Sequence, residues 1–385
     1  MKPDLDIESL FLLSGGRITR GVERVKLARE AQLRATWAAV LSPVVTWLPL
    51  LVLAAVEGLA WGDRVAVPLL KDFLPYGQFL VAVPVLIFAE VTVGRRLGWV
   101  VAELRRSDVL APEDTPALDG LLTRAVELWR GRGLNTVLVL LTCVYTGVSL
   151  WVAREWLTGE WQYVGERMTL PGWWYLLISV PVMRFLTLRW LWRLLLWAWV
   201  LWRVARLSLQ LRPVHPDRAG GLAFLGTTQA EFGVLAFALS VQLSCLIADA
   251  VFFQGANLMA FRGHVIAFVL IVVILFLLPL LVFTPKLVMA REEHLLFLSG
   301  SGYNGADHLE RLLRASERGA LPADEISGLA DFAVLFENAS RMRPVPLEVR
   351  NIFVLVLAAV LPFLPLVFLV MPVSEVFQTL TKLLM

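Results

Sequence analysis

The sequence has few of the residues from which soluble enzymes and disulfide-rich domains are built. Cysteine occurs twice in 385 residues and histidine four times, and only 17% of the residues are charged, against about 25% in an ordinary soluble domain. Cys143 and Cys245 both lie in apolar stretches, so we expect small apolar fillers instead of a disulfide framework or a thiolate metal cluster. No two histidines have the i, i+4 spacing of a zinc-binding helix. We expect no metal and no other cofactor.

Motifs for catalysis are also missing. The sequence has no phosphate-binding glycine loop, no nucleophile elbow and no pair of aspartates inside an apolar stretch. An enzyme is therefore a weaker hypothesis than a transport or binding protein. The net charge of +3 comes without a basic, aromatic-rich patch on a soluble part, so it favours orientation in a membrane over nucleic-acid binding.

What the sequence does have is long apolar runs. Hydrophobic residues make up 58% of the chain, and a helix of about 20 apolar residues crosses a hydrocarbon core about 30 Å thick. We therefore predict an all-α, polytopic transmembrane helical bundle of about seven spans in a bacterial inner membrane, with the lipid bilayer as its main partner. The predicted spans are 35–56, 74–94, 134–154, 173–196, 232–253, 265–285 and 351–371.

The basic residues predict the orientation of these spans. If the N-terminus is cytoplasmic, the cytoplasmic segments hold 26 Lys and Arg residues and the outer segments six, as the positive-inside rule requires. The cytoplasmic segment 1–34 lacks the pattern of a cleaved signal peptide, so we expect it to be retained. With seven spans, the C-terminus would be periplasmic.

Further segments lie between the spans and after the last one. The cytoplasmic link 95–133 should contain an amphipathic helix with Thr115 as its N-cap and Pro116 in its first turn, and this helix should run to about Trp129. Segments 306–318 and 323–342 have apolar residues at helical spacing, so 287–349 is predicted to be a small cytoplasmic helical hairpin that packs on the bundle or on a neighbouring subunit. Residues 350–385 would contain the last span and an amphipathic tail.

Eight prolines fall inside the predicted spans of the 35–286 and 350–385 regions. Each removes a backbone hydrogen bond and kinks or interrupts its helix. Such prolines are common in membrane helices, but discontinuous helices also surround ligand sites in transporters. The doubled prolines of the sixth and seventh spans are the expected breaks. The prolines are Pro43, Pro49, Pro84, Pro181, Pro279, Pro285, Pro362 and Pro365.

The fourth predicted span contains three arginines, which are expensive in a bilayer unless they face protein or water. Arg189 lies at the same estimated depth as Glu90, so we expect an ion pair between them, whereas Arg193 lies nearer the cytoplasmic end. Arg184 lies near the midplane, about 16 Å from Trp173. It has no acidic residue at its depth.

Tyr145 and Gln242 reach a similar depth as Arg184. These three residues are the candidate pore or ligand site, with Arg189 and Glu90 beside it, because an arginine without an acidic partner favours a small anion. The alternative is that Arg184 binds carbonyls exposed by Pro181 or reaches toward the membrane surface.

The cytoplasmic loop after the fourth span contains His215, Asp217, Gly220 and Gly221. Paired glycines permit unusual backbone conformations, and Asp and His side chains cap or bind nearby groups. The loop is either a structural turn or a second candidate site.

Three stretches resemble a group of uncharacterised bacterial polytopic inner-membrane proteins. They are HPDRAGGL at 215–222, DEISGLAD at 324–331 and MRPVPL at 342–347 together with the proline-rich last span. The resemblance covers roughly residues 173–385. It implies an inner-membrane location and no particular activity.

Two functions remain open from the sequence. The first is a homo-oligomeric channel or transporter, possibly anion-selective, because broken helices and intramembrane arginines suggest a polar route. The alternative is a non-conducting membrane scaffold or sensor that binds a partner through its cytoplasmic loops.

Overall fold

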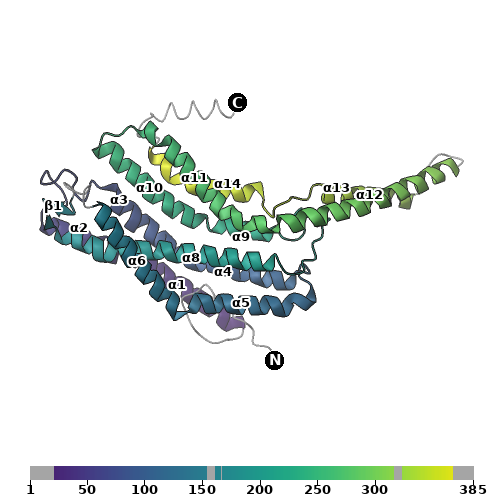
Figure 1. Cartoon of the computed structure of the whole chain (residues 1–385), viewed down its shortest axis with the longest axis horizontal. Helices are drawn as coiled ribbons and strands as arrows, with labels where there is room; N and C mark the ends of the chain where they lie inside the picture. The colour runs from purple at the N-terminus through teal and green to yellow at the C-terminus, as the bar shows by residue number, and fades with distance from the viewer. Residues whose placement is uncertain (1–20, 154–160, 166, 316–322, 367–385) are drawn as a thin grey trace.

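The computed structural model describes residues 21–153, 161–165, 167–315 and 323–366, and it is mostly helical. Strands β1 (Tyr163–Val164) and β2 (Arg167–Met168) form a small antiparallel pair. The long helices lie side by side in a bundle, and a helical hairpin extends away from one end of it (Figure 1). We name this end the hairpin end, and the end that carries β1 and β2 the strand end.

The helices of the first half of the chain are α1 (Gly21–Thr46), α2 (Leu48–Val56), α3 (Phe73–Pro75), the π-helix η2 (Tyr76–Ala82), α4 (Val83–Arg106), the 3-10 helix η3 (Pro112–Asp114), α5 (Thr115–Arg130) and α6 (Arg132–Ala153). Those of the second half are α7 (Leu170–Trp174), the π-helix η4 (Tyr175–Ser179), α8 (Val180–Val204), α9 (Phe224–Glu231), α10 (Gly233–Phe253), the 3-10 helix η5 (Leu258–Phe261), α11 (Arg262–Leu277), the 3-10 helix η6 (Leu278–Phe283), α12 (Thr284–Ala315), α13 (Ala323–Ser340), α14 (Val349–Val360) and the 3-10 helix η7 (Leu361–Phe363).

Several helices are long and apolar enough to cross a membrane. Within the described residues there are five, or six if the pair of helices α5 and α6, bent by 47°, counts as one span. The predicted fourth span lies in the continuous helix formed by α7, η4 and α8. This helix contains four arginines and is not among these candidates. Length and composition thus support a multi-pass helical membrane protein with five or six of the seven expected spans. The candidates are Gln32–Val56, Phe73–Arg106, Phe224–Phe253, Leu258–Gly300 and Val349–Leu366, and the bent pair joins Pro112–Trp129 to Gly133–Val148.

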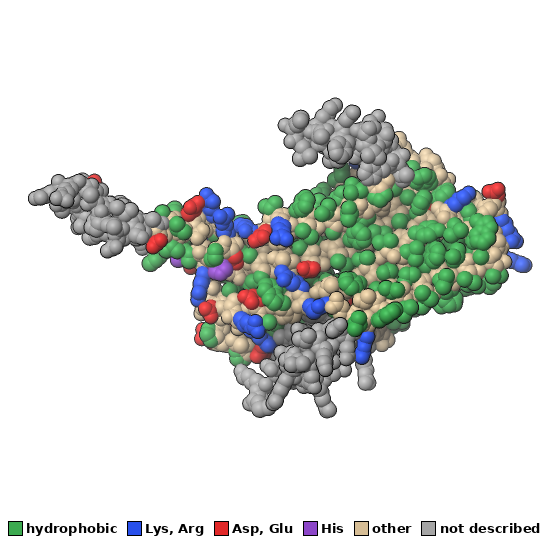
Figure 2. All heavy atoms as spheres, turned by 180° about the vertical axis from the view of Figure 1, so that it is seen from behind, with side chains coloured by type: hydrophobic (Ala, Val, Ile, Leu, Met, Phe, Trp, Pro, Cys, Tyr) green, Lys and Arg blue, Asp and Glu red, His purple; other side chains and the backbone are tan. Residues whose placement is uncertain are grey.

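Apolar and charged side chains occupy different parts of the bundle surface. Seen from behind, hydrophobic side chains cover its middle, and charged ones gather near the hairpin end and at the tip of the strand end (Figure 2). The surface of α6 is typical of this middle zone, with Val144 63% exposed and Leu140 59% exposed. Contact of such an apolar surface with lipid is favourable, whereas its contact with water is unfavourable.

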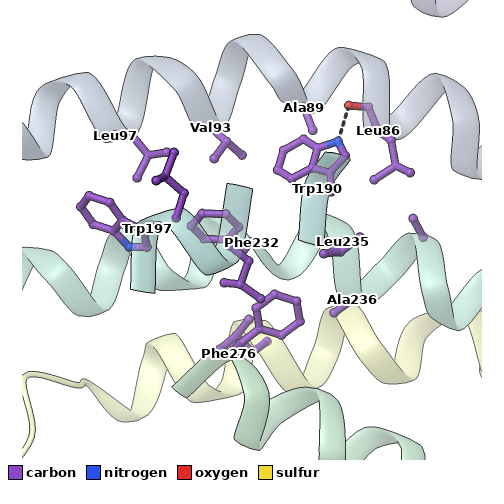
Figure 3. Close-up of a cluster of buried hydrophobic side chains, with 14 of the residues drawn as sticks. Leu86, Ala89, Val93, Leu97, Trp190, Trp197, Phe232, Leu235, Ala236 and Phe276 are labelled. Carbon is purple, nitrogen blue, oxygen red and sulfur yellow. Dashed lines mark hydrogen bonds between the residues drawn. The ribbon is translucent and has the colours of Figure 1, made fainter. Parts of the chain in front are cut away.

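The core lies between α4, α8 and α10. Residues of α4 at helical spacing, Leu86, Val93 and Leu97, are fully buried, as expected for the inner face of a helix with a period of 3.6 residues. Trp190 and Phe232 lie beside these residues and pack edge to face against each other, with their ring centroids 6.3 Å apart (Figure 3). These large side chains fill the space between three helices, so the bundle centre is packed protein.

Hydrogen bonds join loops that are distant in sequence at each end of the bundle. At the hairpin end, the Gln210 amide donates to the Val109 carbonyl at 2.7 Å, and the Arg343 amide donates to the Arg218 carbonyl at 2.8 Å. At the strand end, the Trp161 indole donates to the Asp72 carboxylate at 2.8 Å. The connections predicted to be cytoplasmic therefore meet at one end and those predicted to be periplasmic meet at the other.

The prolines change helix geometry in two ways. Pro84 and Pro181 lie two residues after the ends of the π-helices η2 and η4, where a wider turn accommodates a residue that cannot donate a hydrogen bond. Pro279 and Pro362 lie in the 3-10 helices η6 and η7. The sixth and seventh predicted spans are thus interrupted locally by 3-10 stretches at these prolines, within the otherwise continuous helices Leu258–Gly300 and Val349–Leu366.

Other local predictions need correction. Thr115 is the first residue of α5 and not its cap, since the cap position belongs to Asp114, whose carboxylate accepts from the Ser208 amide. Cys143 is exposed on the surface and is not a core filler, while Cys245 is partly buried.

The hairpin also differs from its prediction. Its first arm is the single long helix α12, which packs on the bundle only at its beginning, where Leu287 is fully buried. The rest of α12 extends away from the bundle together with α13 (Figure 1), and packing on a neighbouring subunit stays a prediction. The segment 1–20 of the N-terminus and residues 367–385, which include the predicted tail, lie outside the described residues.

Candidate functional site

The main charge cluster inside the bundle joins α4 to α8. Glu90 lies on the buried face of α4, and its Oε1 atom is 3.0 Å from Arg189 Nε and 3.3 Å from Arg193 Nη2. The ion pair between Glu90 and Arg189 is therefore present, and Arg193 shares the same oxygen. The spacing of four residues between the two arginines places them on one face of the helix, a signal that could have predicted this sharing.

Two tryptophans cover the guanidinium groups of this cluster. The Arg193 guanidinium carbon lies 4.8 Å from the ring centre of Trp129 and 4.6 Å from that of Trp190, and that of Arg189 lies 5.3 Å from Trp129. The Trp190 indole in turn donates to the Leu86 carbonyl at 3.2 Å, which fixes its ring. Aromatic faces stabilise buried cations, so this cluster is well suited to holding two positive charges beside one carboxylate.

Arg184 lies apart from this cluster, at the contact between α8 and α6. Its guanidinium carbon is 4.2 Å from the ring centre of Tyr145, so the structure brings together two of the three residues of the predicted midplane site. Its Nη1 atom is buried and has no hydrogen-bond partner among the described residues. Tyr145 itself is 53% exposed on the surface of α6. This is a cation at the edge of an apolar surface.

Gln242, the third predicted member, binds elsewhere. Its side-chain oxygen accepts from Gln78 of η2 at 3.5 Å, and its amide donates to the Ala238 carbonyl. Ser240 donates within its own helix to Ala236. The polar residues of α10 therefore belong to the contact between α10 and η2, and they do not assemble around Arg184.

Side chains from α9 and α10 bind carbonyl oxygens at the broken helices. Ser244 donates to the Pro362 carbonyl at 2.6 Å, and Gln229 donates to the Phe276 carbonyl next to η6. A freed carbonyl inside a membrane must find a donor, and here the donors are protein groups. At both breaks a side chain of the protein binds the freed carbonyl. This weakens the interpretation of the breaks as part of an open polar route.

The glycine-rich loop is a structural junction. Asp217 Oδ1 accepts from the amides of Ala219 and Gly221 at 2.9 and 3.1 Å, and Oδ2 accepts from the Ala223 amide, at the start of α9, at 3.1 Å. Burial acts to raise the pKa of the Asp217 carboxyl, but these three amides and His215 outweigh it and hold that pKa below its ordinary value. His215 Nδ1 lies 2.8 Å from Asp217 Oδ1.

The two glycines of this loop have left-handed backbone conformations, with φ of +63° at Gly220 and +94° at Gly221. A Cβ atom at Gly221 would come within 2.8 Å of Val109, and one at Gly220 within 3.0 Å of Met342. Only glycine allows this close approach. These contacts favour a structural turn, which joins three segments of the chain, over a second ligand site in this loop.

One polar cluster at the strand end was not predicted. Asp72 caps α3 by accepting from the Leu74 amide, and it also accepts from Trp161. Asp249, at the end of α10, accepts from the Phe73 amide at 2.9 Å. The contact depends on the pairing of distant loops, so the local sequence gave no signal for it. In the part of the chain that the structure describes, no group of three or more His, Cys, Asp or Glu residues is arranged to hold a metal ion.

The helices, their apolar middle zone and their charged ends define a class, the multi-pass helical membrane proteins. Comparison with protein-family models, with curated proteins and with solved structures gave no match.

Proposed function

We propose that this chain is a homo-oligomeric membrane channel or transporter for a small anion, with Arg184 as the cation that the anion meets. The observation that supports this is the environment of Arg184. It lies in the middle of a helix that runs from Leu170 to Val204, its guanidinium stacks on Tyr145, and its Nη1 is buried without a hydrogen-bond partner among the described residues.

The surface of α6 around Arg184 is apolar and exposed. Val144 and Val148 of α6, next to Tyr145, are 63% and 54% exposed, so in a monomer this edge would face acyl chains. A charge near the bilayer centre costs at least about 2.5–3.5 kcal/mol on insertion scales, and an arginine does not readily lose its proton. Water, an anion or a second copy of the chain must therefore cover Arg184.

The proposal includes seven spans, with the N-terminus and the hairpin in the cytoplasm and α6 and α8 crossing the membrane. A cysteine at Asp63, in the exposed loop of the strand end, should react with an impermeant thiol reagent added outside intact cells. A cysteine at Ser299, on α12, should react only after lysis. The native Cys143 and Cys245 are replaced by alanine in both variants, and the reverse labelling pattern would invert the topology.

Anion transport is tested with purified protein in liposomes. We expect the wild type to release chloride or a larger inorganic anion faster than protein-free vesicles. Arg184→Gln should lower this flux at least tenfold, because it removes the local positive charge, and a tenfold change corresponds to about 1.4 kcal/mol. Arg184→Lys, which keeps the charge but not the planar stacking, should retain part of the flux.

The control is Arg64→Gln. This arginine belongs to an exposed loop at the strand end and donates to the Glu57 carbonyl, so its loss should leave the flux unchanged. Equal release from protein-free, wild-type and Arg184→Gln vesicles, with all proteins folded and inserted, would reject anion transport.

A second function is supported by the hairpin. Leu296 and Phe297 of α12 are 73% and 68% exposed, and Val334 of α13 is 55% exposed, on a part of the chain that extends from the bundle. Exposed apolar side chains outside the membrane favour contact with another protein, as a scaffold or sensor requires. Leu296→Ser with Phe297→Ser should then reduce complex size in detergent and leave the flux of the Arg184 assay unaffected.

A further inference from the structure

A groove between α5 and α8, at the hairpin end, belongs neither to the arginine–glutamate cluster nor to Arg184. Its volume is about 370 Å³, within the range of small-molecule sites. Its lining combines apolar residues with three arginines and contains no acidic residue. The lining residues are Ala117, Gly120, Leu121, Arg124, Trp199, Arg203, Arg206 and Leu207.

The three arginines of this groove are exposed. In the described chain, the side chains of Arg124, Arg203 and Arg206 form no ion pair and no hydrogen bond. This differs from the neighbouring Arg105, whose guanidinium lies 2.6 Å from the Asp119 carboxylate. Three positive charges therefore converge on one groove without a carboxylate to neutralise them, and such a group attracts an anion.

Tryptophans hold two of these arginines in place. The Arg206 guanidinium carbon lies 3.7 Å from the ring centre of Trp202, and that of Arg203 lies 5.7 Å from Trp199 and 5.5 Å from Trp202. Stacking of this kind fixes the plane of a guanidinium and leaves its N–H edge available, which suits the bidentate binding of a phosphate group.

The position of the groove indicates where the phosphate comes from. The groove is lined by Trp199 and Arg203 from the end of α8 and by Arg206 and Leu207 directly after it. Tryptophans are enriched at the boundary between membrane and water. Among the lining residues of the groove, Leu121 and Leu207 are partly buried and the three arginines are exposed, so we name the two leucines its apolar floor. A free phosphate ion has no apolar part that could contact this floor, whereas a phospholipid carries its phosphate next to apolar carbon chains.

We propose that this groove binds the phosphate headgroup of an anionic phospholipid, with Arg124, Arg203 and Arg206 as the phosphate ligands and the apolar floor in contact with the glycerol and upper acyl chain. The proposal does not depend on anion transport, because it involves other residues and a different surface.

The test uses the full chain in neutral detergent and measures binding of phosphatidylglycerol, with phosphatidylcholine as the uncharged comparison, by native mass spectrometry and by the shift in thermal unfolding. We expect phosphatidylglycerol to bind and to stabilise the protein more than phosphatidylcholine does. Each single Arg→Gln change should weaken phosphatidylglycerol binding about fivefold, and the triple change on the order of a hundredfold.

Two further variants separate the groove from general charge effects. A Cβ atom at Gly120 would meet no atom within 4 Å, so Gly120→Met should fold, fill the groove and reduce binding with all three arginines intact. Arg167→Gln, at the exposed strand β2 of the opposite end, removes the same charge and should leave binding unchanged.

Three results would overturn the proposal. One is equal affinity of the wild type, the triple variant and Gly120→Met for phosphatidylglycerol. Another is an equal loss of affinity in Arg167→Gln and Arg203→Gln. The third is stabilisation by millimolar inorganic phosphate that matches the effect of phosphatidylglycerol and is lost in the triple variant, which would assign the groove to a free anion.

Discussion

Replacing Glu90 by glutamine tests how the bundle holds two arginines beside one carboxylate. Both guanidinium groups contact Oε1 of Glu90, at 3.0 and 3.3 Å, and the Glu90 side chain is only 8% exposed. An ion pair at about 4 Å contributes about 4 kcal/mol at an effective dielectric constant of 20. Glu90 attracts both arginines, and the repulsion between Arg189 and Arg193 offsets part of these two attractions. Breaking a buried pair typically costs about 3–5 kcal/mol, and we expect Glu90→Gln to fall in this range.

The exposed fractions of the two arginines make the prediction sharper. The Arg193 side chain is 1% exposed and that of Arg189 is 19% exposed, so only Arg189 can reach water once the carboxylate is gone. Adding Arg193→Met to Glu90→Gln should therefore restore more stability than adding Arg189→Met.

The assay is the free energy of unfolding in mixed detergent micelles, together with the midpoint of thermal unfolding, for all single and double variants. Arg105→Gln is the control, since it breaks a pair whose side chains are 28% and 31% exposed and should cost less than about 1 kcal/mol. A loss of stability in Glu90→Gln as small as in this control would contradict the prediction, and so would a rescue by Arg189→Met at least as large as that by Arg193→Met.

Three further variants test the junctions of the fold. Asp217→Asn should lower the free energy of unfolding by about 1–2 kcal/mol at pH 7; because the folded pKa of this carboxyl is depressed, the difference should persist above the ordinary pKa of about 3.9 and disappear as the pH falls through the lower folded value. Gly221→Ala should cost about 1–3 kcal/mol in chemical unfolding, since its Cβ would press on Val109, and a neutral result would contradict the tight approach. Ser244→Ala should cost about 1–2 kcal/mol and speed amide exchange around η7, because the Pro362 carbonyl loses its donor; unchanged exchange would mean that the hydrogen bond does not stabilise the break.

Much of this architecture was predictable because it depends on local composition. Long apolar runs favour helices in a membrane for lack of any other hydrogen-bond partner, and the described residues contain five or six helices of this kind. The breaks at Pro279 and Pro362 followed from the missing amide hydrogen of proline. Equal depth was enough to predict the contact of Glu90 with Arg189, because a buried charge requires a partner.

Tertiary structure alone decided which polar groups meet. Depth along a helix specifies only one coordinate, and rotation and neighbour choice depend on how side chains pack across helices. Gln242 therefore binds Gln78 on η2, although its depth matched that of Arg184. In the hairpin, α12 and α13 are in contact with each other and extend away from the bundle, an arrangement that their separate amphipathic patterns do not reveal. The arginine groove between α5 and α8 likewise exists only where two segments about 80 residues apart in sequence lie together, because packing brings their charges to one place.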